Sequence, residues 1–192
     1  MFRRLKADCL VLGTILTLSL ASIALATGQQ AKLQQITGLE QPIHSPDGRF
    51  ELLYMRNATK PDEQYHEIWL RSPADLSKQT LLYSYGRGVE VLWSPDSTMV
   101  AITDQESSSD SFVKVFRISS PSTFTEIKEV QPFVDSHAKK MLSQYDHFYA
   151  EVVAWPKDSK FLIIRLRGDF AELEGKRHEA QKKVTFTIPK KK

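Results

Sequence analysis

Short runs of alternating apolar and polar residues, separated by turn-forming residues, fill most of the chain after residue 42. Within 65–71, His66, Ile68 and Leu70 fall on one side and the intervening residues on the other. Within 184–188, apolar residues alternate with threonines. A period of two is typical of β-strands with one buried side. The pattern predicts a mostly β protein built from antiparallel strands.

Three related turns each precede one of these strand-like runs. They read Ser45-Pro46-Asp47-Gly48, Ser94-Pro95-Asp96-Ser97 and, more loosely, Pro156-Lys157-Asp158-Ser159. Proline presets φ at the first corner position, and aspartate followed by glycine or serine suits the next positions. A phrase that recurs at a spacing of about 50 residues indicates a repeated structural unit. We expect four-stranded antiparallel meanders in which the second strand follows the turn.

The meanders require a definite set of strands. The strands expected from the pattern are 50–56, 65–71, 79–85, 89–93, 99–103, 112–118, 124–130, 147–155, 161–167 and 183–188. The charged stretch 169–182 is expected to form a loop or a short helix. The last strand is expected to pair with the first unit, where it would cover an edge open to aggregation.

An extra segment separates the second and third turns and predicts one inserted helix around 134–146. Its apolar residues recur at helical spacing. They are Val134, Ala138, Met141, Leu142 and Tyr145. Pro132 is expected to precede the helix, and Asp135 or Ser136 to cap it.

The N-terminal segment has the layout of a secretory signal peptide. Three basic residues precede an apolar stretch over 10–26, which ends in Ala24-Leu25-Ala26. We expect a signal peptide over 1–26, cleaved after Ala26; the alternative is an uncleaved membrane anchor. The remaining regions are then a linker or arm over 27–42, one β-repeat domain over 43–188 and a basic tail over 189–192.

Charge and cysteine usage narrow the class of partner and the compartment. The chain has 26 basic and 23 acidic residues. Removing the leader, which holds three basic residues and one acidic residue, leaves a net charge of +1. This balance gives no reason to expect nucleic acid as a partner. Cys9, the one cysteine, lies in the leader, so the exported domain has no disulfide. We expect a periplasmic or secreted protein.

The turn phrases resemble the WD40-like, TolB-type β-propeller repeat of bacterial exported proteins. His44–Tyr54 and Trp93–Thr103 match the repeat well, and Trp155–Arg165 matches it loosely. The resemblance implies a propeller-like architecture over about residues 39–188. Closed propellers use about 4–8 blades, however, and this chain has about three repeats. Three arrangements stay open: an incomplete array, a ring completed by a homodimer, and an irregularly closed ring.

No constellation for catalysis, metal binding or a cofactor emerges from the sequence. The five histidines show no metal-ligand spacing. Gly86-Arg87-Gly88 lacks the third glycine and the helix of a dinucleotide site. Nucleophile-elbow and zinc-protease motifs are missing from the sequence. We therefore expect no cofactor, no metal and no catalytic residue.

Antiparallel geometry nevertheless predicts one functional face. Loops 57–64, 85–88 and 104–110 and the helical insertion should share one end, opposite the repeated turns. The candidate contact residues at that end are Tyr85, Arg87, Asp104, Asp110, His137 and Tyr145. We expect a non-enzymatic module that mediates protein–protein interaction in the cell envelope. The alternatives are an inhibitor or immunity protein for a secreted toxin, and a small propeller-like hydrolase or lyase.

Overall fold

The fold consists of strands and one helix arranged in successive hairpins. The computed structural model describes residues 34–36, 41–56, 66–143, 145–169 and 179–190. The elements are β1 (Gln34–Ile36), β2 (Ile43–His44), β3 (Glu51–Arg56), β4 (His66–Ser72), β5 (Asp75–Tyr85), β6 (Val89–Trp93), β7 (Met99–Asp104), β8 (Asp110–Ser120), β9 (Thr123–Glu126), α1 (Val130–Leu142), β10 (His147–Ala154), β11 (Phe161–Asp169) and β12 (Glu179–Thr187). The prediction of a mostly β protein is confirmed.

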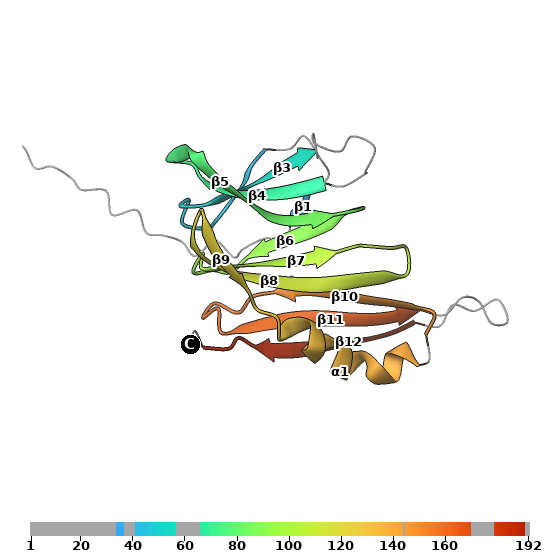
Figure 1. Cartoon of the computed structure of the whole chain (residues 1–192). Coiled ribbons are helices and arrows are strands. Elements are labelled where there is room, and N and C mark those ends of the chain that lie inside the picture. Colours follow the sequence, from blue (N-terminus) through green and yellow to red (C-terminus); the bar gives the residue numbers. More distant parts are fainter. Residues whose placement is uncertain (1–33, 37–40, 57–65, 144, 170–178, 191–192) are drawn as a thin grey trace, which may run out of the picture.

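Three meanders follow one another along the chain and stack in the same order (Figure 1). The first unit is the sheet β2-β3-β4-β5, the second runs from β6 to β9, and the third is β10-β11-β12. Strands within each unit pair antiparallel. A short parallel pairing between β8 and β10 joins the second unit to the third. The second unit therefore lies between the other two.

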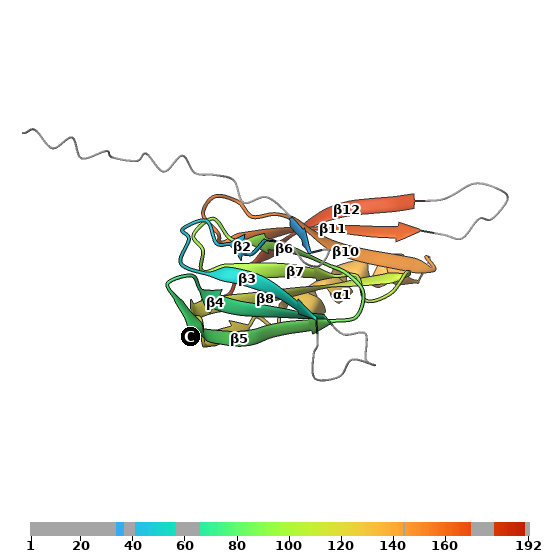
Figure 2. The same cartoon turned by 90° about the horizontal axis from the view of Figure 1, so that it is seen from above.

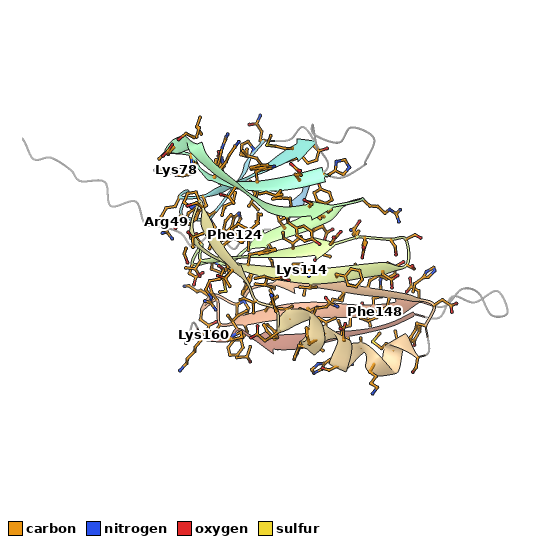
Figure 3. The ribbon with its side chains drawn as sticks, in the orientation of Figure 1. Arg49, Lys78, Lys114, Phe124, Phe148 and Lys160 are labelled. Atoms are coloured by element: carbon orange, nitrogen blue, oxygen red, sulfur yellow. The ribbon has the colours of Figure 1, made fainter. Side chains whose placement is uncertain are left out.

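The repeated turns and the longer loops lie at opposite ends of the stack (Figure 2). Arg49 in the first turn and Lys160 in the third mark the turn end (Figure 3). At the other end, β5 leads into β6 at residues 86–88, and β7 leads into β8 at 105–109. This separation follows from antiparallel pairing, as the sequence predicts. We call the two ends the turn end and the loop end.

Each Ser-Pro-Asp turn is closed by its own side chains. In the first turn, Ser45 Oγ accepts the Phe50 N–H at 3.0 Å and donates to Asp47 Oδ1 at 2.8 Å. In the second, Ser94 Oγ does the same with the Met99 N–H at 2.9 Å and with Asp96 Oδ1 at 2.6 Å. These bonds satisfy backbone groups that the turn would otherwise leave open, which explains why this phrase precedes a strand.

The three turns are also bonded to one another across the units. The Asp47 N–H donates to Ser97 Oγ at 3.0 Å, and the Asp96 N–H donates to Ser159 Oγ at 3.3 Å. Ser97 and Ser159 are buried, with φ of 59° and 55°. Gly48 holds the equivalent place in the first turn, with φ of 71°. We call this set of bonds the turn ladder; it fixes the stacking of the units.

The core is divided into two clusters on the two faces of the second unit. One lies between the first and second units and includes Leu70 and Ile102. The other lies between the second unit, α1 and the third unit, and includes Val115, Val134 and Ile164. Both clusters draw on β7, which is buried along its whole length. The second unit is therefore the structural centre of the molecule.

Several expected boundaries are wrong. Part of the predicted linker, Gln34–Ile36, forms β1 and pairs with β6. The helix begins at Val130, four residues before the expected start, so the strand expected over 124–130 is shorter. Pro132 lies in the first helical turn, where its missing N–H has no helical partner to lose. The cap is Glu129, which makes no side-chain capping bond.

The final strand also differs from the expectation. β12 pairs with β11 along its length and not with the first unit. It begins at Glu179, within the charged stretch expected to be loop or helix. Only nine residues separate β12 from β11, so β12 reaches its hairpin neighbour more readily than the far end of the stack. Among the described residues, the third unit has three strands. The expected signal peptide over 1–26 and the loop 57–64 lie outside the described residues.

Candidate functional site

Two clefts open at the loop end, one on each side of the β7–β8 connection. The Asp104 cleft, about 560 Å³, lies between the first and second units. It is lined by Tyr83, Ser84, Tyr85, Gly86, Asp104, Glu106, Phe112, Lys114 and Gln131. The Arg87 cleft, about 460 Å³, lies between the second and third units. It is lined by Arg87, Gly88, Gln105, Ser107, Ser108, Ser111, Tyr149, Glu151 and Arg167.

A buried carboxylate and a tyrosine form the centre of the Asp104 cleft. Asp104 ends β7 and is 5% exposed. Its Oδ2 accepts a hydrogen bond from Tyr83 Oη at 2.6 Å, whereas its Oδ1 is buried with no hydrogen-bond partner among the described residues. Burial raises the pKa of Asp104, and the nearby Glu106 adds to this rise against the opposing effects of Tyr83 and Lys114. Burial and Asp104 also raise the pKa of Tyr83.

The other walls of this cleft are aromatic or already paired. Tyr85 is 3% exposed, and the centre of its ring lies 5.2 Å from that of the His66 ring. The Nδ1 of His66 is hydrogen-bonded to Tyr54 Oη at 2.8 Å. The Lys114 Nζ lies 3.0 Å from Glu126 Oε1. Because Lys114 is held by a carboxylate of its own, Asp104 and Glu106 give the cleft an acidic character.

The Arg87 cleft has the opposite character. Arg87 is exposed, in the turn between β5 and β6. Glu151 pairs with Arg165, whose Nε donates to Glu151 Oε2 at 2.8 Å. The guanidinium of Arg167 lies over the Tyr149 ring, 4.6 Å from its centroid. Serine hydroxyls, two arginines and one glutamate thus line a polar cleft in which basic side chains outnumber acidic ones, beside the acidic cleft.

The structure brings three of the six candidate residues to the clefts. Asp104 and Tyr85 line one cleft and Arg87 the other. Asp110 begins β8 and lies outside both clefts. Its carboxylate accepts hydrogen bonds from the Ser107 and Ser109 hydroxyls and so stabilises the β7–β8 loop.

The remaining two candidates lie away from both clefts. His137 is exposed on α1, where its Nδ1 lies 2.9 Å from the Phe133 carbonyl oxygen. Tyr145 follows the helix and packs against the second core cluster. Most of the insertion lies away from the clefts, because α1 packs against β8 and the third unit, and Gln131 is the one described residue of α1 that lines a cleft.

Other residues of the clefts are absent from the sequence prediction. Tyr83 is two residues before Tyr85 on the same strand, so the period of two places both side chains on the same face. The position of Tyr85 in the sequence could therefore have indicated Tyr83 as a cleft residue. Tyr149 and Arg167 come from the third unit. Their approach to the β7–β8 connection depends on how that unit packs against the second, which periodicity along the chain does not encode.

The clefts are the main chemical feature of the described residues. Across these residues, His, Cys, Asp and Glu form no group of three able to hold a metal ion. Within the same residues, no helix has the length and apolarity to cross a membrane. Comparisons with protein families, curated proteins and solved structures give no match for this chain. Evidence on function therefore comes from the geometry of the two clefts.

Proposed function

We propose that this chain is an exported, non-enzymatic β-repeat module that binds another protein through its loop end. The main support for this proposal is that two adjacent clefts differ in charge. The acidic Asp104 cleft lies between the first and second units, and the Arg87 cleft lies between the second and third. Loops on a rigid β scaffold supply binding surfaces in many folds. An acidic and a basic cleft side by side suit a partner segment with charges of both signs, because complementary charge sets register and speeds association.

We infer that the three units form an open, propeller-like array. Four-stranded meanders in the first two units and the turn ladder between units support this arrangement. The ladder needs a serine hydroxyl in each receiving turn, and the first turn has Gly48 in that position. The third turn therefore has no matching acceptor in the first, either within one chain or in a second copy. This favours an open array over a ring closed through the same bonds.

Crosslinking from single positions tests the binding proposal. A photoreactive phenylalanine analogue is placed at Arg87 on the loop end and, as a matched control, at Lys160 on the turn end. Both positions are exposed. After irradiation of cells expressing the full chain, we expect one protein adduct from position 87 and none from position 160. Adducts of equal yield from both positions, or from neither, would contradict the proposal.

The Asp104 cleft favours one second candidate, a small hydrolase or lyase. Clustered titratable groups are what such chemistry needs, and Asp104, Tyr83 and Glu106 share this cleft. A carboxyl whose pKa is raised suits general acid–base catalysis. The test is a panel of chromogenic esters, phosphate esters and glycosides. Turnover that disappears in Asp104→Asn supports the enzyme, and no turnover above buffer removes it.

A further inference from the structure

The Asp104 cleft has features that select one chemical class of ligand. Asp104 is more than nine-tenths buried, and one of its oxygens has no hydrogen-bond partner among the described residues. Glu106 adds a second acidic group to the same cleft, and no basic side chain of the described residues lies within hydrogen-bond distance of either. The nearest cation in the cleft, Lys114, is paired with Glu126 and offsets the cost of the buried carboxylate only in part, so a further cation that enters the cleft would lower this cost.

The walls of the cleft suit the carbon stem of a long cationic side chain. Tyr83, Tyr85 and Phe112 line it together with the carboxylates. Aromatic rings attract ammonium and guanidinium groups through their faces and also cover apolar methylenes. A volume of about 560 Å³ is within the range of small-molecule and side-chain pockets. A simple inorganic cation would gain little from three aromatic residues.

We propose that the Asp104 cleft receives a lysine or arginine side chain of the partner protein, with Asp104 and Glu106 as its counter-ions. This rests on the proposed function, since it names which group of the partner enters which cleft. Tyr83 acts as a positioning residue: its hydroxyl holds one oxygen of Asp104, and the other oxygen is buried with no hydrogen-bond partner among the described residues.

Small lysine analogues test the site without the partner. Nα-acetyl-lysine methylamide is titrated into the isotope-labelled protein, and amide resonances are followed by NMR. The probes for comparison are the norleucine analogue, which lacks the charge, and the glutamate analogue, which reverses it. We expect saturable shifts at residues 83–86, 104–106 and 112–114 with the lysine probe alone. Equal shifts with norleucine would overturn the proposal, since the cleft would then be merely apolar.

Substitutions identify the counter-ion. Asp104→Asn is expected to weaken the lysine probe about tenfold, equivalent to about 1.4 kcal/mol. Asp158→Asn at the turn end removes the same charge from an exposed carboxylate and should leave binding unchanged. Glu106→Gln, on an exposed side chain, should weaken binding by a smaller factor and provides a second variant if Asp104→Asn does not fold. Unchanged affinity in both cleft variants would overturn the proposal.

The two proposals fail in distinguishable ways. If position 87 crosslinks a partner but Asp104→Asn leaves the yield unchanged, the cation site is wrong and the binding module stands. If the lysine probe binds in the cleft but no partner crosslinks at the loop end, the site stands and the proposed function is wrong.

Discussion

The hydroxyl groups of two turn serines, Ser97 and Ser159, link neighbouring units, a role that the turn pattern alone does not indicate. Ser97 and Ser159 occupy left-handed corner positions, which cost a non-glycine residue about 1 kcal/mol or more. A glycine would remove that strain, as Gly48 does in the first turn. The serines instead supply the acceptors of the turn ladder. The sequence predicts the turns, but not these two bonds, because their partners are 50 and 63 residues apart.

The ladder bond predicts a difference between two substitutions of Ser97. Ser97→Ala keeps the backbone strain and removes the acceptor for the Asp47 N–H, so we expect a loss of about 1 kcal/mol in the free energy of unfolding. Ser97→Gly also removes the acceptor but relieves the strain, so its loss should be smaller. Urea unfolding of both variants measures this. Alanine that is no worse than glycine would show that the strain contributes little, and parental stability in both variants would show that the ladder bond contributes little.

Asp104 makes stability depend on pH. Its pKa is raised in the folded protein, chiefly by burial, so the folded state keeps this proton at pH values where the unfolded chain has released it. The contribution of protonated Asp104 is complete below the unfolded pKa and is lost as the pH rises through the folded pKa. Asp104→Asn cannot ionise, and its amide oxygen can still accept the Tyr83 bond. We expect it to be more stable than the parent at pH 7, by about 1 kcal/mol.

The size of this difference across pH is the decisive measurement. Urea unfolding at several pH values should show the advantage of Asp104→Asn shrinking as the pH falls toward the ordinary aspartate value of about 3.9. Asp158→Asn, which removes an exposed carboxylate at the turn end, serves as the control for the substitution itself. An advantage that stays constant with pH would mean that ionisation of Asp104 is not its source.

Equivalent residues in the repeat differ in what they do. Trp93 and Trp155 precede their turns at the same place in the sequence pattern. Trp155 Nε1 donates to the Leu92 carbonyl oxygen at 3.1 Å and so joins the third unit to the second. The Nε1 of Trp93 is buried with no partner among the described residues, and its ring stacks with Phe50. Their shared role as core residues could be predicted, whereas their different polar contacts depend on the neighbouring unit.

At the scale of elements, periodicity identifies strands well and boundaries less well. The alternation in 66–70 places Ile68 and Leu70 in the core, as expected. The start of α1 escapes the pattern because Val130 and Gln131 also fit the end of a strand. β1 cannot be predicted from the pattern because it has only three residues, too few to show an alternation. It forms a strand because it pairs with β6 in the folded protein.

The contact between β11 and the segment after α1 gives an element-scale prediction. A Cβ on Gly168 would lie 2.7 Å from Cγ of Tyr145. Gly168→Ala therefore forces the ring or the strand to move, and we expect a loss of about 1–3 kcal/mol. Gly86→Ala is the matched control, since a Cβ there meets nothing within 4 Å and should change stability little.

A double-mutant cycle measured by urea unfolding separates this clash from other effects. Tyr145→Ala alone should also destabilise the protein, because its ring packs against the second core cluster. In the double variant the added methyl has room, so the combined loss should be smaller than the sum of the two. Strict additivity would show that the two residues do not compete for the same space.

At the scale of the whole molecule, the sequence predicts the units and the two ends, but not their contacts. Turn phrases and strand periods act within about 50 residues, so they predict meanders and place the loops together. The clefts lie between units, and their lining combines residues from different units, such as Tyr83 with Asp104 and Arg87 with Arg167. Such pairs depend on how the sheets stack, which is determined by core shape and by the turn ladder. This is why half of the candidate residues reach a cleft and half do not.

The position of the second unit predicts how the molecule unfolds. Its two faces supply both core clusters, so loss of either cluster exposes a face on which the other depends. Ile164→Val in the third unit, at a fully buried position, should cost about 0.5–1.5 kcal/mol. Two single-tryptophan versions, one keeping Trp69 in the first unit and one keeping Trp155, report unfolding by fluorescence. We expect Ile164→Val to lower the urea midpoint in both, relative to its own background. A midpoint at Trp69 that does not move would show that the first unit unfolds independently, as in an array whose repeats are weakly coupled.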